Sequence, residues 1–205
     1  MAHYKLHYFN LGGRGEFIRK ILAQAGVEFE DHRITMEEWP QVKPSFPNGQ
    51  VPVLEVDGKY LAQSYAIARF LARKHNLTGK DDWEAAKADM YVDGVEEVIQ
   101  KTMPMVMALL FGKGDLNEVL AKLKPEVFEP FFTKYEKILH ENGGEHFVGK
   151  QLTWADIMIA DFLQRLSWVD STVLDGHSGL KTFVRHIHDL PNIKKHTAAH
   201  TDMKW

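Results

Sequence analysis

The 205-residue sequence contains no cysteine. A chain without cysteine has no disulfides, no thiolate metal ligands and no cysteine nucleophile. If this protein takes part in thiol chemistry, the thiol must therefore arrive with a ligand.

The sequence also lacks a long apolar run and an excess of positive charge. No stretch approaches the roughly 20 apolar residues of a membrane-spanning helix, and the first residues, MAHYKLHYF, have the pattern of a strand rather than of a leader. The formal net charge of -3 gives no reason to expect nucleic acid as a partner. We therefore expect a cytoplasmic protein that binds neither membranes nor nucleic acid. Its 44% hydrophobic content is typical of a globular chain.

The pattern of hydrophobic residues changes near residue 78. Before that point it predicts a βαβ unit followed by a ββα unit, which is the arrangement of a thioredoxin-like domain over residues 1–78. The expected strands are 4–9, 29–35, 51–58 and 59–62, with a hairpin turn at Asp57-Gly58, and the expected helices are 16–26 and 64–75. After the polar linker NLTGKDD, a period of 3.6 residues predicts an all-helical domain over residues 82–205. Its expected helices are 83–100, 116–141, 153–169 and 178–190.

The stretch HYFNLGGRGEF places Tyr8 at the end of the first strand, directly before a glycine-rich turn. The segment LGGRG lacks the lysine of a Walker loop and the register of a dinucleotide site, which disfavours nucleotide binding. Tyr8 is then either a core aromatic or a ligand-binding residue, because ligands bind at the carboxyl ends of strands in open α/β sheets. Thioredoxins and glutaredoxins carry a cysteine after this strand, whereas this chain has Tyr8.

A spaced set of residues resembles the cytosolic glutathione transferases. The set is Tyr8, Arg14, Trp39, Lys43, Gln50-Val51-Pro52 and Gln63-Ser64, followed by LTWADIMIADF in the helical half. Within that family the chain is most similar to the sigma class, in its nematode type. The resemblance covers essentially the whole chain. It implies the glutathione transferase fold, an α/β thioredoxin-like domain that binds glutathione followed by an all-α domain that carries a hydrophobic acceptor site.

The resemblance also implies a role for each site residue. Tyr8 would donate a hydrogen bond to the glutathione thiolate, with Arg14 adding to it. The residues implied to bind the rest of glutathione are Trp39 and Lys43 for the glycyl carboxylate, Gln50, Val51 and a cis Pro52 for the cysteinyl part, Gln63 and Ser64 for the γ-glutamyl carboxylate, and Glu97 of the partner subunit, or else Asp93, for the ammonium group. The acceptor site would include Phe9, Gly13, Met103, Pro104, Met107, Leu110, Met158, Phe162 and Trp205.

Several of these residues have simpler explanations that remain open. Pro52 could be a turn proline, Ser64 is expected to cap the helix that it begins, and the acidic run around Glu97 could be a solvated helix face. Most of a methionine-rich helical stripe is normally core, although methionines also adapt to varied apolar ligands. Asp156 fits a capping box with Thr153, so we assign it to folding rather than to chemistry.

Eleven histidines raise the question of a metal site. The pairs His186/His188 and His196/His200 could each lie on one face, but HTAAH lacks the glutamate of H-E-x-x-H. We therefore expect surface histidines and no required metal.

The sequence predicts a homodimeric glutathione transferase that conjugates glutathione to hydrophobic electrophiles. Asn48 stands where several sister classes carry an aromatic residue that locks the dimer, which implies a more polar interface. The alternatives are a non-catalytic carrier of haem or other hydrophobic ligands, a structural protein like the lens crystallins of this class, and a glutathione-dependent prostaglandin isomerase. The last is placed in doubt by VDGVEEV, because glutamates stand there where the vertebrate prostaglandin synthases carry aspartates.

Overall fold

The computed structural model describes residues 2–200, which form two compact units. One unit contains the chain up to Thr78 together with the residues from Ile187 onward, and the other runs from Gly79 to His186. The domain limits expected from the sequence, 1–78 and 82–205, stay a prediction.

The first unit is built on a four-stranded sheet with strand order β2-β1-β3-β4. The strands are β1 (Tyr4–Phe9), β2 (Phe29–Ile34), β3 (Val53–Val56) and β4 (Lys59–Ala62). β1 is parallel to β2 and antiparallel to β3, which forms a hairpin with β4. Asp57 and Gly58 both have positive φ, at 49° and 80°, which a two-residue hairpin turn of this kind requires. The predicted thioredoxin-like sheet is therefore confirmed.

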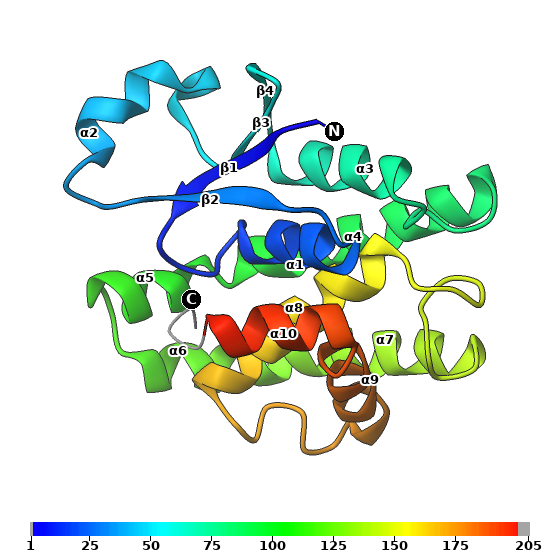
Figure 1. Cartoon of the computed structure of the whole chain (residues 1–205). Coiled ribbons are helices and arrows are strands. Elements are labelled where there is room, and N and C mark those ends of the chain that lie inside the picture. The colour runs from blue at the N-terminus through cyan, green and yellow to red at the C-terminus, as the bar shows by residue number, and fades with distance from the viewer. Residues whose placement is uncertain (1, 201–205) are drawn as a thin grey trace. The chain divides into compact units, whose positions relative to one another are not determined.

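Helices cover one face of this sheet. Figure 1 shows α1 (Glu16–Gln24) and α3 (Ser64–Lys74) on the same side of the strands, and α10 (Pro191–Ala199) packs on α1. Leu6 of β1, Ile18 of α1 and Leu71 of α3 are 0% exposed. α10 was not expected from the sequence.

The connection between β2 and β3 contains three short helices, where the sequence analysis expected no helix. They are α2 (Trp39–Val42), η1 (Lys43–Ser45) and η2 (Pro47–Gly49). A proline lies in the first turn of each, where its missing N–H leaves no hydrogen bond unmade. The prolines therefore start these helices and also keep them short.

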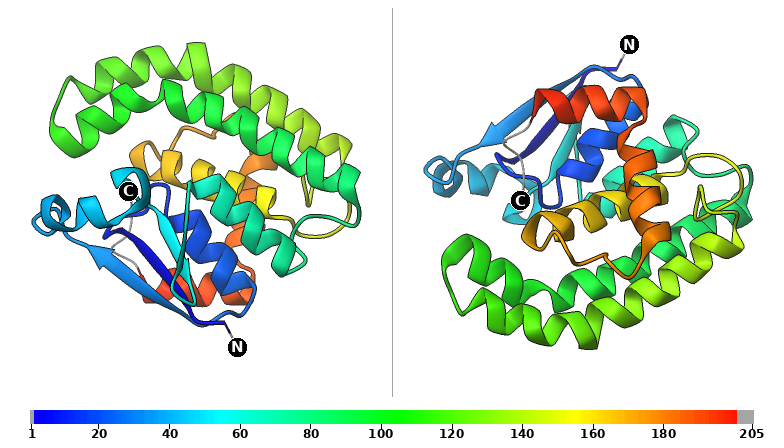
Figure 2. Two further views of the ribbon diagram at one scale, coloured as in Figure 1. Left: turned by 90° about the horizontal axis from the view of Figure 1, so that it is seen from above. Right: turned by 90° about the horizontal axis from the view of Figure 1, so that it is seen from below.

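The second unit is helical, as predicted. Its elements are α4 (Asp82–Lys101), α5 (Met103–Phe111), α6 (Leu116–Leu123), the π-helical turn η3 (Lys124–Phe128), α7 (Glu129–Glu141), α8 (Trp154–Val169) and most of α9 (Ser178–His188). Figure 2 shows α4 and α7 lying side by side. The Tyr135 hydroxyl of α7 donates to the Tyr91 carbonyl of α4 at 2.6 Å. A Cβ at Gly94 would lie 2.5 Å from that hydroxyl oxygen, so glycine lets the two helices approach.

The single helix expected over residues 116–141 is wrong. The segment is interrupted by the π-helical turn, which contains Pro125, and α7 then begins with Pro130 in its first turn. Proline cannot donate the backbone hydrogen bond of a continuous α-helix, so the ladder changes register there. The apolar residues after Met103 also form a helix of their own, α5.

The capping box at the start of α8 is confirmed. The carboxylate of Asp156 accepts hydrogen bonds from the backbone N–H of Thr153 and of Phe147, both at 2.8 Å, and from the Thr153 hydroxyl at 2.9 Å. Asp156 is 0% exposed, so water cannot replace these contacts. The folding role assigned to Asp156 follows from this geometry.

We expect Asp156→Ala to lower the free energy of unfolding by about 2 to 4 kcal/mol, because two buried backbone N–H groups would lose their acceptor. Urea unfolding measures this change. The control is Asp115→Ala, which removes the exposed N-cap of α6 and should cost only about 1 kcal/mol. Equal losses in the two variants would show that the buried Phe147 contact contributes nothing.

Candidate active site

Tyr8 is the second-to-last residue of β1. Figure 1 shows the chain turning from the end of this strand into α1. Its side chain is 7% exposed. The phenol oxygen accepts a hydrogen bond from the backbone N–H of Arg14 at 2.9 Å. A hydroxyl that accepts one hydrogen bond is polarised and donates its own proton more strongly. The turn after β1 thus prepares Tyr8 as a donor.

The glycines of this turn make room for the tyrosine ring. A Cβ at Gly15 would lie 2.3 Å from Tyr8 Cδ1, and one at Gly13 would lie 2.6 Å from Tyr8 Oη. Gly13 also has a φ of 42°, which disfavours other residues. The spacing of the glycines in LGGRG is therefore explained by the packing of Tyr8, which the sequence alone did not indicate.

The side chain of Arg14 extends toward the start of α3. Its guanidinium carbon lies 5.7 Å from the centre of the Tyr65 ring, within range of a cation–π contact. Tyr65 in turn packs on the buried Phe17 of α1, with ring centres 5.7 Å apart. Arg14 therefore reaches Tyr8 through its main chain, while its charge lies beside the residue that follows Ser64.

Two further segments were predicted to bind glutathione. Gln50-Val51-Pro52 lies directly before β3, and Gln63-Ser64 lies directly after β4. The peptide bond between Val51 and Pro52 is cis, as the resemblance implied, and Pro52 directly precedes β3. Gln50, two residues before the proline, is extended and exposed. The proline thus stands just before the strand, where its missing N–H breaks no ladder hydrogen bond.

The expected N-cap at Ser64 is wrong by one residue. Ser64 is the first residue of α3, and Gln63 is in the N-cap position with no side-chain cap bond. Gln63 has φ 75° and ψ 113°, a conformation that costs a non-glycine residue about 1 to 3 kcal/mol. Strain of this kind clusters at binding sites, and the free N–H groups at a helix N-terminus favour anions in general. The buried Ser64 lies at that helix terminus.

Trp39 packs against an apolar cluster that also contains Phe9. Phe9 follows Tyr8 along β1, so this cluster lies on the sheet face opposite Tyr8. Trp39 packs against Phe9 and Phe46, with ring centres 5.1 and 6.3 Å apart. Lys43 is exposed, and its Nζ lies 6.0 Å from the centre of the Trp39 ring. The half-buried tryptophan thus orients a lysine whose charge faces solvent.

Sequence patterns did not reveal a buried polar network beneath this site. Glu16, Arg19 and Lys20 are 4%, 0% and 2% exposed, although charged residues of a surface helix are normally solvated. Glu16 accepts from His196 of α10 at 3.0 Å, when that ring nitrogen carries a proton. His196 is therefore buried, which corrects the expectation of a surface histidine. The one available signal was the helical spacing of Glu16, Arg19 and Lys20, which places these three polar residues on one side of α1.

His7 and His32 form a pair on the sheet face opposite Tyr8. His7 is 5% exposed and contacts His32 through its Nδ1 at 2.8 Å and Glu55 through its Nε2 at 3.0 Å. Burial lowers the pKa of His7, and the carboxylate of Glu55 opposes this effect. Because His7 alternates with Tyr8 along β1, the pair does not share the face of the tyrosine.

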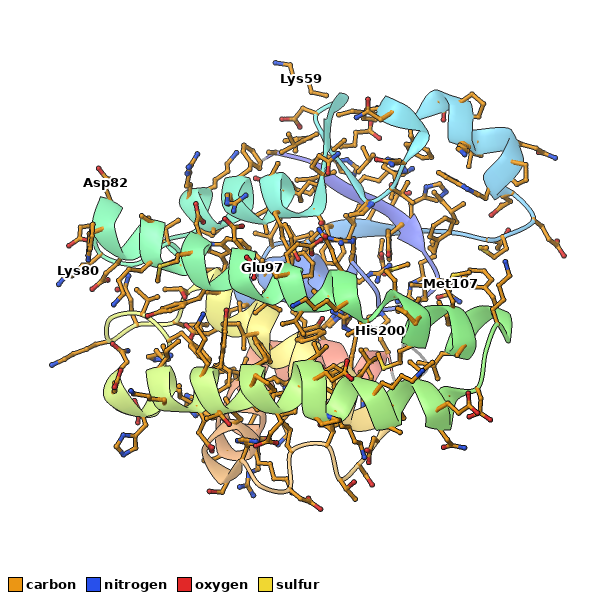
Figure 3. The ribbon with its side chains drawn as sticks, turned by 180° about the vertical axis from the view of Figure 1, so that it is seen from behind. Lys59, Lys80, Asp82, Glu97, Met107 and His200 are labelled. Atoms are coloured by element: carbon orange, nitrogen blue, oxygen red, sulfur yellow. The ribbon has the colours of Figure 1, made fainter. Side chains whose placement is uncertain are left out.

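The acidic residues implied for glutathione binding lie on the helical unit. Asp93 and Glu97 are both exposed on α4, one turn apart, and Figure 3 labels Glu97 on that helix. Their four-residue spacing places them on one face. Asp93 and Glu97 are therefore neighbours on α4, which belongs to the second unit, whereas Tyr8 belongs to the first.

The residues expected to line the acceptor site differ in exposure. Met103 and Leu110 of α5 are 49% and 43% exposed, whereas Met158 and Phe162 of α8 are 0% and 1% exposed. The remaining expected members are the exposed Pro104, the half-buried Met107 (Figure 3), Phe9 and Gly13 in the first unit, and Trp205, which lies outside the described residues. Their common role in an acceptor site stays a prediction.

Among residues 2–200, no group of three or more histidine, aspartate and glutamate side chains is placed to hold a metal ion. Within the same range, no helix is long and apolar enough to cross a membrane.

Comparison with known proteins identifies the family. Residues 4–73 match the family model of the glutathione S-transferase N-terminal domain, and residues 95–200 match that of the C-terminal domain. The chain belongs to the glutathione S-transferase family. It is 42% identical to glutathione S-transferase 1 of Ascaris suum over 95% of both chains.

Two solved structures of nematode proteins are similar over nearly the whole chain. A monomeric glutathione S-transferase, Na-GST-3 of Necator americanus, has a TM-score of 0.94 and 37% identity, covering 99% of this chain and 100% of that one. A Nu-class glutathione S-transferase of Haemonchus contortus has a TM-score of 0.90 and 39% identity, covering 100% of both. The predicted transferase fold is therefore confirmed.

We expect Gly15→Ala to displace the Tyr8 ring and to lower both the stability and the transferase activity. Overpacking of this kind costs about 1 to 3 kcal/mol, which thermal unfolding measures. Gly176→Ala is the matched control, because neither glycine has a positive φ and a Cβ at Gly176 would meet nothing within 4 Å. A Gly15→Ala protein as stable and as active as Gly176→Ala would contradict the packing argument.

Proposed function

We propose that this protein uses Tyr8 to stabilise the thiolate of glutathione and transfers that thiolate to hydrophobic electrophiles. The observation that carries this proposal is the Tyr8 hydroxyl, which is buried at the end of β1 and hydrogen-bonded by the Arg14 N–H. Membership of the glutathione S-transferase family supports it.

The chemistry required of Tyr8 is modest in energy. A free thiol has a pKa of about 8.5, so only a small fraction is thiolate at neutral pH. Lowering that pKa by about 2 units requires roughly 2.7 kcal/mol of preferential stabilisation of the anion. A charge-assisted hydrogen bond from a phenol is worth about 1.5 to 3 kcal/mol. A phenol with a pKa near 10 stays protonated at neutral pH and can therefore donate.

In the reaction the thiol loses its proton to solvent and Tyr8 donates a hydrogen bond to the sulfur anion. The sulfur then attacks the electrophile, forming a carbon–sulfur bond while the leaving group departs with the electron pair. Tyr8 keeps its own proton throughout. The residue therefore stabilises a nucleophile that belongs to the substrate.

The ends of glutathione are assigned to separate anion-binding features. The N–H groups at the start of α3, at Ser64, would receive the γ-glutamyl carboxylate. Lys43, held by Trp39, would receive the glycyl carboxylate. The backbone of Val51, next to the cis bond to Pro52, would pair with the cysteinyl residue as an added strand does. The strained Gln63 conformation supports a binding role at this edge.

The apolar electrophile is assigned to the methionine-rich helix α5. Met103, Met107 and Leu110 leave apolar surface partly or largely exposed on that helix. Flexible thioether side chains adapt to ligands of varied shape, which suits a transferase with several acceptors.

Finer assignments rest on the sequence resemblance. We propose the sigma class on the basis of Tyr8, Arg14 and the segment around Asn48, and a cytoplasmic location for the enzyme. Haem carriage and prostaglandin isomerisation stay alternatives to this reading, and independence from metal ions stays a prediction.

We expect Tyr8→Phe to reduce turnover at neutral pH by at least about tenfold, equivalent to 1.4 kcal/mol. The ring is kept and the donor is removed, so glutathione should still bind through its carboxylates. Steady-state kinetics, together with ultraviolet titration of the bound thiolate, measure both effects. The control is Tyr60→Phe, which makes the same change at an exposed tyrosine of β4. Unchanged turnover in Tyr8→Phe would remove this residue from the mechanism.

We also propose that the protein works as a homodimer. A groove of about 580 Å³ on the first unit is lined by Leu61, Ala66, Arg69, Phe70, Arg73 and Lys74. Its basic character complements the acidic face of α4 that carries Asp93 and Glu97. In a two-fold dimer each complementary contact would occur twice.

If the partner subunit supplies Glu97 to the γ-glutamyl ammonium group, Glu97→Gln should weaken glutathione binding by about fivefold while the dimer stays intact. The contact would be exposed, so a larger effect is not expected. Calorimetry measures the affinity and sedimentation measures the oligomeric state. Glu126→Gln is the control, since it removes an exposed glutamate elsewhere in the helical unit. The similar protein Na-GST-3 is monomeric. A fully active monomer of the present protein would contradict the dimer proposal.

A further inference from the structure

Arg19 is the most fully buried charged residue near Tyr8. It lies on α1 with 0% of its surface exposed, and its guanidinium carbon is 5.7 Å from the centre of the Tyr8 ring. A buried guanidinium must satisfy its N–H donors within the protein, because an unpaired buried charge is strongly unfavourable. The partners it uses therefore indicate its role.

Two of those partners are carbonyl groups of the turn that follows Tyr8. Nη2 donates to the Phe9 carbonyl at 3.2 Å, and Nη1 donates to the Leu11 carbonyl at 3.0 Å. These carbonyls belong to the segment between Tyr8 and Arg14, whose N–H donates to the Tyr8 hydroxyl. Arg19 therefore holds the start of the turn, and the end of the same turn holds the phenol.

The other contacts fix the guanidinium itself. Nε donates to both carboxylate oxygens of Asp31 on β2, at 2.9 and 3.1 Å. Nη1 also contacts Glu16 at 3.5 Å, and Glu16 is bound by His196 of α10. The planar fork of arginine can make these contacts in several directions at once, which the single ammonium group of lysine cannot do.

We propose that Arg19 is a positioning residue that aligns the Tyr8 hydroxyl with the glutathione sulfur by fixing the turn between Phe9 and Arg14. This inference rests on the proposed function of Tyr8. The alignment of the Tyr8 hydroxyl depends on the geometry of the guanidinium group. A positive charge alone at position 19 does not align it. Arg19 itself does not touch glutathione.

The test is Arg19→Lys, which keeps the charge and removes the fork. We expect the pKa of the bound glutathione thiol, measured by ultraviolet titration of the thiolate, to rise by about one unit. kcat/KM at a pH below that pKa should then fall about tenfold, with the KM for glutathione changed less than about threefold. A purely structural role would lower the melting temperature and leave the thiol pKa of the folded protein unchanged.

Arg33→Lys is the matched control. Arg33 also binds Asp31, through Nε at 2.8 Å, and its Nη1 binds Asn10 at 2.9 Å. The same substitution there disturbs the same carboxylate while the contacts to the Phe9 and Leu11 carbonyls remain. We expect a thiol pKa equal to that of the unsubstituted protein. An equal rise in both variants would overturn the proposal.

If Arg19→Lys does not fold, Asp31→Asn provides the second test. It keeps the size of the side chain and weakens the anchor of Arg19 Nε, so we expect a smaller rise of the thiol pKa in the folded protein. If Arg19→Lys folds and its thiol pKa is unchanged, the inference is overturned. If only Asp31→Asn folds, an unchanged thiol pKa in that variant overturns it. If the unsubstituted protein itself does not lower the thiol pKa, the proposed function of Tyr8 fails instead.

Discussion

The close packing of the Tyr8 ring against the turn before α1 is the contact on which the site depends. Gly13 and Gly15 have no side chains, so the backbone can approach the ring, and the same approach brings the Arg14 N–H within 2.9 Å of the hydroxyl. A side chain at Gly15 would separate strand and helix at the point where the thiol is expected. The two glycines therefore determine both the position of the Tyr8 ring and the hydrogen bond that its hydroxyl accepts.

The two units contribute different kinds of structure to the proposed reaction. The sheet unit supplies fixed backbone groups at the ends of β1 and β3 and at the start of α3, and such groups suit a substrate of constant shape. α5 of the helical unit exposes flexible methionine side chains, which suit substrates of varied shape. Under the proposed reaction, one fold would thus combine a co-substrate of fixed shape with acceptors of varied shape.

Local rules predicted much of this structure. The hairpin at Asp57-Gly58, the capping box of Asp156 and the strand that ends near Tyr8 depend on residues close in sequence, so pattern alone was sufficient. The π-helical turn around Pro125 was missed because the helical period continues through it. The burial of His196 depends on Glu16, 180 residues away, and no local pattern reports that distance. The same holds for Arg19, whose partner Asp31 belongs to another element.

The hydrogen bond between Tyr135 and the Tyr91 carbonyl has a consequence for experiments in alkaline solution. Burial raises the pKa of Tyr135 far above its usual range, and the nearby Tyr91, Glu97 and Asp93 add to the rise. The phenol therefore keeps its proton throughout the range in which a thiol ionises. The hydrogen bond between α7 and α4 therefore persists across that pH range. A titration of the bound thiol is not complicated by ionisation of Tyr135.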